Sequence, residues 1–175
     1  LLVPWYSLGV EFPVYQVATI TVNLKYIIAG IIFLIASTSD FLDGYLARKN
    51  NMVTDFGKVM DAIADKVLVN GVLVVLACNG VINEIIPVII ITRDIFVDSI
   101  KMVAGSKGKA VGASILGKLK TICMMSGLTL TFFYNIPFEL INLDVANGLL
   151  YIACVLSIIS GVQYYLVNKE YFKEK

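Results

Sequence analysis

The sequence predicts an all-α, polytopic membrane helix bundle. Hydrophobic residues make up 58% of its 175 residues, charged residues 15%, and the mean hydropathy is +0.84. Soluble domains are about 45–50% apolar and about 25% charged. The charges also gather between long apolar stretches instead of spreading along the chain. This composition and this pattern place the chain among integral membrane proteins.

Each predicted element is an apolar segment close to the length that crosses a bilayer, about 20 residues. The predicted helices cover 25–48, 57–79, 81–104, 116–134 and 145–168. Loops are expected at 9–24, 50–56, 78–84, 105–115 and 135–144. Residues 1–8 are expected to be the end of an earlier helix that begins before this sequence. With no internal repeat, we expect one domain over 1–175.

Basic residues predict how the bundle lies in the membrane. Most lie at one set of helix ends: Arg48, Lys49, Lys101, Lys107, Lys109, Lys118, Lys120, Lys169, Lys173 and Lys175. The opposite ends carry Lys25 with Glu11, Glu84, Glu139 and Asp144. Cytoplasmic loops are enriched in Lys and Arg. We therefore expect the Arg48, Lys107 and Lys169 ends to face the cytoplasm, in an inner or cytoplasmic membrane.

Several kinds of chemistry are excluded by composition. The chain has no histidine, which removes His general bases, Ser–His and Cys–His pairs, and His-ligated zinc. Its three cysteines, Cys78, Cys123 and Cys154, lie far apart in apolar runs and are expected to be buried, without disulfides. The net charge of +1 gives no indication of a nucleic-acid partner.

Four aspartates lie within the first two predicted helices. Asp40 and Asp43 are three residues apart, Asp61 and Asp65 are four apart, and each pair shares a helix face. Ionisable residues in membrane helices are costly and usually functional. Two antiparallel helices with a short connection would bring the pairs face to face. Such a cluster would hold one or two hard divalent cations, Mg²⁺, Mn²⁺ or Ca²⁺, near the cytoplasmic interface.

Small residues accompany these aspartates. Gly44 follows Asp43, Gly57 precedes Asp61 by one turn, and Ala47 is also small. They predict a groove over the cation site, although close helix packing in membranes favours the same residues. Arg48 would reach a phosphate or an aspartate there, or would anchor the helix at the cytoplasmic surface.

The stretch from Asp40 to Asp65 reads DFLDGYLARKNNMVTDFGKVMDAIAD. It resembles the signature of the CDP-alcohol phosphotransferases, D-x2-D-G-x2-A-R-x8-G-x3-D-x3-D, at every fixed position. The resemblance implies a membrane enzyme of six helices, the first of them largely missing from this sequence. It also implies a homodimer with its site open to the cytoplasmic leaflet.

The resemblance further implies a role for each motif residue. Two Mg²⁺ or Mn²⁺ ions would be held by Asp40, Asp43, Asp61 and Asp65, and Asp65 would also be the catalytic general base. The CDP group would be bound by Gly44, Ala47, Arg48 and Gly57. The implied reaction moves a phosphatidyl group from CDP-diacylglycerol to an alcohol, with the metal ions clamping the pyrophosphate and a carboxylate deprotonating the acceptor.

The acceptor is predicted from basic residues in the third and fourth helices. Arg93, Lys101, Lys118 and Lys120 would suit a phosphorylated alcohol. The stretches IIITRDIFVDSIKMVAGSKG and LGKLKT resemble the corresponding region of phosphatidylglycerophosphate synthases, which implies glycerol 3-phosphate. Asp94, Asp98 and Lys101 depart from the Glu, Thr and Arg expected there. Two local ion pairs offer a structural alternative, Arg93 with Asp94 and Lys101 with Asp98.

Other functions remain as alternatives at this point. The same reaction with inositol phosphate, serine or phosphatidylglycerol as acceptor is the nearest. An aspartate-rich prenyltransferase would carry a DDxxD run, which this spacing does not match. A divalent-cation channel or transporter would use intramembrane aspartates, but gains nothing from an arginine beside them.

Overall fold

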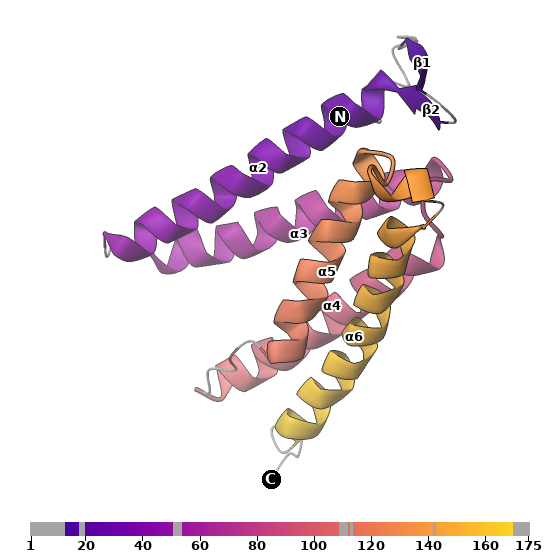
Figure 1. Cartoon of the computed structure of the whole chain (residues 1–175). Helices are drawn as coiled ribbons and strands as arrows, with labels where there is room; N and C mark the ends of the chain where they lie inside the picture. Colours follow the sequence, from indigo (N-terminus) through magenta and orange to yellow (C-terminus); the bar gives the residue numbers. More distant parts are fainter. Residues whose placement is uncertain are drawn as a thin grey trace.

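The computed structural model describes residues 13–17, 20–50, 54–108, 112, 114–141 and 143–169. Their main elements are five long helices in an antiparallel succession (Figure 1). The helices are α2 (Leu24–Lys49), α3 (Asp55–Cys78), α4 (Ile85–Ser106), α5 (Ile115–Phe132) and α6 (Val145–Asn168). A short 3₁₀ helix, η1 (Phe138–Ile141), lies between α5 and α6. The predicted all-α membrane bundle is thus confirmed, with helix ends within four residues of the predicted ones.

The N-terminal region departs from the prediction. Residues 9–24 were expected to form a loop, but β1 (Val14–Val17) and β2 (Ile20–Asn23) pair as an antiparallel two-stranded sheet, with Val14 opposite Asn23. β-branched residues favour strands. The Tyr134 hydroxyl accepts a hydrogen bond from the Asn23 amide at 2.7 Å, which ties the sheet to the end of α5. The predicted helical tail at 1–8 lies outside the described residues.

Side-chain caps explain where three of the helices begin. Thr54, Ser114 and Asp144 each precede a helix and accept a hydrogen bond from a backbone amide three residues later. Such caps satisfy amides that the first helical turn leaves unpaired. Polar residues at the ends of apolar runs therefore set the helix starts.

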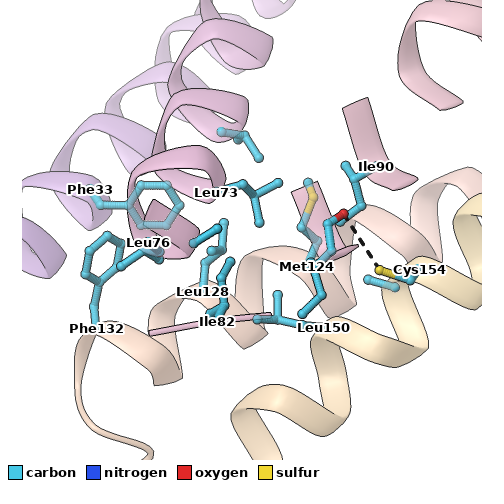
Figure 2. Packing of buried hydrophobic residues seen from close by; sticks show 14 of the residues in the cluster. Phe33, Leu73, Leu76, Ile82, Ile90, Met124, Leu128, Phe132, Leu150 and Cys154 are labelled. Carbon is cyan, nitrogen blue, oxygen red and sulfur yellow. Dashed lines mark hydrogen bonds between the residues drawn. The ribbon is translucent and has the colours of Figure 1, made fainter. Parts of the chain in front are cut away.

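The core joins all five long helices through apolar side chains (Figure 2). Phe33 of α2 packs against Phe132 of α5, with ring centroids 5.6 Å apart. Gly127 of α5 allows a close helix contact, because a Cβ there would lie 2.9 Å from Leu150 of α6. Cys154 of α6 is buried and lies 4.0 Å from the Ile86 carbonyl oxygen of α4. The expectation that all three cysteines are buried thus holds for Cys154, whereas Cys123 is only partly buried and Cys78 is exposed at the end of α3.

The outer surface is that of a membrane protein. α6 alone exposes nine large apolar side chains, among them Ile152, Val155 and Leu166. Exposed apolar surface of this extent is unfavourable in water. By length and composition, three described segments can span a bilayer: Leu24–Leu46, Ile115–Phe132 and Val145–Asn168. The two remaining long helices, α3 and α4, have charged residues within their apolar stretches, and several of these charges line the site described next.

Two parts of the bundle differ in packing. α6 packs along both α4 and α5, whereas α2 and α3 form a hairpin whose connected end extends away from α4, α5 and α6 (Figure 1). The motif aspartates lie along this hairpin, and the predicted acceptor residues lie on α4 and α5.

Candidate active site

A polar cavity of about 580 Å³ lies where α3, α4, α5 and α6 meet. Its charged lining consists of five cations and three carboxylates: Lys66, Arg93, Lys101, Lys118, Lys120, Asp65, Asp94 and Asp98. All four residues predicted to bind the acceptor phosphate therefore line one cavity, together with the predicted base. The cavity has a net positive charge of two. Such a site attracts anions.

Asp94 links two of these cations. Its carboxylate accepts hydrogen bonds at 2.9 Å from Nη1 of Arg93 and from Nζ of Lys120. The three side chains are between 5% and 13% exposed. Buried charges are tolerated when they are paired and hydrogen-bonded. The predicted alternative of an Arg93–Asp94 pair thus exists, and the pair lies in the wall of the cavity.

A second ion pair connects α3 to α4. Lys66 donates to Asp98, and each side chain is 39% exposed. The structural alternative considered from the sequence paired Asp98 with Lys101 on its own helix. Instead, Lys101 Nζ lies 5.5 Å from the ring centroid of Tyr164 on α6, at cation–π distance. The rotation of α4 about its axis explains why Asp98 pairs with Lys66, because it turns the Asp98 side chain toward α3.

Lys66 is a site residue that sequence reasoning missed. A charge directly after Asp65, inside an apolar segment, was the available signal. Asp65 itself lies within electrostatic range of Asp40, Lys120, Asp94 and Lys66. The cavity and the aspartate hairpin therefore meet at Asp65.

The motif aspartates on α2 and on α3 lie at matching distances from the connected end of the hairpin. Asp43 lies six residues before the end of α2, and Asp61 lies six residues after the start of α3. Asp40 and Asp65 lie nine and ten residues from the same two ends. All four side chains are exposed. Within the described residues, no three acidic or cysteine side chains are close enough together to hold a metal ion.

The oxygen ligands that these aspartates offer, and their matching positions along α2 and α3, nevertheless fit a hard divalent cation. Carboxylates are the oxygen ligands that Mg²⁺ and Mn²⁺ prefer. Two pairs on antiparallel arms, about 9 Å and about 14 Å from the helix ends at 1.5 Å per residue, can face each other across the hairpin. Drawing these four like charges together requires cations.

The small residues of the motif have more than one role. The Gly57 amide donates to Thr54 Oγ1 at 3.0 Å, and a Cβ on Gly57 would lie 3.0 Å from that oxygen. Gly57 therefore belongs to the cap of α3, a structural role that the spacing alone did not indicate. Gly44 is partly buried in α2. Ala47 and Arg48 are helical, and their side chains lie outside the described part of the chain.

Comparison with known proteins identifies the class. The family model for CDP-alcohol phosphatidyltransferase matches residues 7–159. The chain belongs to this family, which sets aside the prenyltransferase and channel alternatives.

Curated relatives narrow the comparison further. A CDP-diacylglycerol–glycerol-3-phosphate 3-phosphatidyltransferase of Bacillus subtilis is 35% identical over 158 residues, or 90% of this chain and 82% of that protein. The one from Rickettsia bellii is 37% identical over 150 residues, covering 85% and 83%. The one from Mycoplasma genitalium is 44% identical over 115 residues, covering 66% and 49%.

Proposed function

We propose that this protein transfers the phosphatidyl group of CDP-diacylglycerol to glycerol 3-phosphate, which releases CMP and forms phosphatidylglycerophosphate for phospholipid biosynthesis. Family membership and relatives named for this reaction support the proposal. The observation that carries it is the polar cavity, in which the proposed base Asp65 lies beside five cationic side chains.

The charge of the cavity favours a phosphorylated acceptor. Five cations and three carboxylates leave an excess of two positive charges. A phosphate monoester carries about −1.5 to −2 charges at pH 7. Serine and phosphatidylglycerol have no such group, so the cavity does not favour them. Inositol phosphate has the same charge as glycerol 3-phosphate, and the names of the relatives favour the latter.

The proposed chemistry is a single displacement at phosphorus. Arg93, Lys101, Lys118 and Lys120 bind the acceptor phosphate, and Asp65 accepts the proton of the acceptor hydroxyl. The hydroxyl oxygen then forms a bond to the lipid-side phosphorus, and the bond from that phosphorus to the CMP oxygen breaks. Because the acceptor oxygen is the nucleophile, no covalent enzyme intermediate is required.

The metal and nucleotide sites are part of the proposal. Asp40, Asp43, Asp61 and Asp65 would hold Mg²⁺ or Mn²⁺, two ions in all. When bound, these ions would offset the negative charge of the pyrophosphate and of the departing CMP. Gly44, Ala47, Arg48 and Gly57 would contact the CDP group, which follows from their place in the family motif.

We also propose that the chain is a single domain and that it works as a homodimer in the cytoplasmic membrane. We further propose that its site faces the cytoplasm. The excess of Lys and Arg at the corresponding helix ends supports this orientation.

Release of CMP by purified protein in detergent tests the proposed function. CDP-diacylglycerol and Mg²⁺ or Mn²⁺ are supplied with one acceptor at a time: glycerol 3-phosphate, inositol phosphate, serine or phosphatidylglycerol. We expect release with glycerol 3-phosphate and none when EDTA removes the metal. Release only with another acceptor would overturn the assigned acceptor, and undiminished release with EDTA would overturn the metal requirement.

A further inference from the structure

Arg93 lies between two different environments. It lines the polar cavity, and it also lines an apolar groove of about 500 Å³ between α4 and α6. The groove is otherwise surrounded by residues such as Ile89, Phe96 and Ile158. A flexible arginine at this boundary has to be held if its guanidinium is to act in the polar cavity.

α6 provides two hydrogen bonds to this guanidinium. Nη2 of Arg93 donates to Ser160 Oγ at 2.7 Å, and Nε donates to the Ser157 carbonyl oxygen at 3.3 Å. The Ser160 hydroxyl donates its own proton to the same carbonyl oxygen at 3.1 Å. Its lone pairs are therefore left to accept from Arg93. Ser157 and Ser160 are both fully buried, so bulk water does not compete with these bonds.

Two glycines lie against the arginine, and one of them makes room for it. A Cβ on Gly161 of α6 would lie 3.2 Å from Arg93 Cγ, and a Cβ on Gly117 of α5 would lie 3.7 Å from Nη2. The Gly161 distance is tighter than an ordinary contact, and it involves the root of the side chain, which has little freedom to move. An alanine at 161 would displace Arg93.

We propose that Ser160 and Gly161 are positioning residues that hold the Arg93 guanidinium toward the acceptor phosphate. With Nε, one Nη1 hydrogen and one Nη2 hydrogen occupied by Ser157, Asp94 and Ser160, two of its five N–H donors remain for a ligand. Pre-orienting a charged fork in this way improves phosphate binding without any contact between α6 and the substrate. The inference rests on the proposed function of the cavity.

Steady-state kinetics of Ser160→Ala tests the first residue. Loss of one hydrogen bond to a charged group should raise the KM for glycerol 3-phosphate by about tenfold. The KM for CDP-diacylglycerol should stay within about twofold, because Arg93 is assigned to the acceptor phosphate and not to that substrate. Ser99→Ala is the control, since Ser99 on α4 is exposed and its hydroxyl donates to the Ile95 carbonyl oxygen of its own helix. It should change neither KM.

Gly161→Ala tests the second residue by a different route. The added methyl group should raise the KM for glycerol 3-phosphate several-fold by displacing Arg93. Gly148→Ala is the matched control on the same helix, because a Cβ on Gly148 would meet no atom within 4 Å. Both changes gain the same helix propensity. The difference in the KM for glycerol 3-phosphate between Gly161→Ala and Gly148→Ala therefore measures the effect of the contact with Arg93.

Direct binding separates this inference from the proposed function. Calorimetric titration of each variant with glycerol 3-phosphate, and with inorganic phosphate, needs no turnover. Weaker binding by Ser160→Ala and Gly161→Ala than by their controls supports positioning. Unchanged binding, or an equal rise in the KM of both substrates with a lower melting temperature, would overturn it. If the unmodified protein releases CMP only with another acceptor, the proposed function is wrong, and the same variants are compared with that acceptor.

Discussion

The two halves of the site are built differently. In the proposed acceptor half, which comprises the cavity residues of α4, α5 and α6, Arg93, Asp94 and Lys120 form a buried hydrogen-bonded network that is already assembled without a ligand. In the α2–α3 hairpin, the four motif aspartates are exposed, and the connected end extends away from the other helices (Figure 1).

The difference follows from charge. The acceptor half contains both cations and carboxylates, which pair with one another and can pack closely. The hairpin motif contributes four carboxylates, which repel one another unless cations intervene. A site for a phosphate can therefore be preformed by the protein alone, whereas a site for metal ions depends on the ions.

The largest expected effect comes from Asp65, where the two halves meet. Asp65→Asn should lower turnover by about 10²–10⁴-fold, because an amide cannot accept the acceptor proton. CMP release measures this effect. Glu84→Gln is the control, since Glu84 is exposed at the start of α4 and makes no capping bond; its activity should match that of the unmodified protein. Full activity of Asp65→Asn would remove this residue from the mechanism.

A smaller effect on activity, but a large one on stability, is expected in the acceptor half. Asp94→Asn leaves the buried charges of Arg93 and Lys120 without their shared carboxylate, and removing one partner of a buried pair costs about 3–5 kcal/mol. Thermal unfolding in detergent should show a clear drop in melting temperature. Asp43→Asn, in the exposed motif, should leave the metal-free melting temperature nearly unchanged. Equal losses in the two variants would contradict the contrast between the halves.

The smallest effect is expected for the Lys66–Asp98 pair, which joins α3 to α4 at the edge of the cavity. Because 39% of each side chain is exposed, a double-mutant cycle of Lys66→Met and Asp98→Asn should give a coupling energy of about 0.2–1 kcal/mol. The coupling should weaken as ionic strength rises. A coupling of several kcal/mol that resists salt would show that this pair is as buried as the Asp94 network.

The sequence by itself determined the five long helices, the membrane class, and most of the charged residues that line the cavity, although not Lys66. Apolar run length predicts the number of long helices, polar residues such as Thr54 and Ser114 set their starts, and spacing places Asp40 and Asp43 on one face. Their charge within apolar segments was also sufficient to identify Arg93 and Lys120 as candidate site residues. Charged residues in membrane helices are costly and usually mark a functional site.

Only the tertiary structure decided how these residues pair. Asp98 meets Lys66 instead of Lys101, Arg93 is held by Ser160, and residues 14–17 and 20–23 pair as strands instead of lying in a loop. These outcomes depend on the rotation and crossing of whole helices, which are set by packing such as Gly127 against Leu150. Spacing along one helix defines its faces, but which neighbour each face meets is a property of the assembled bundle.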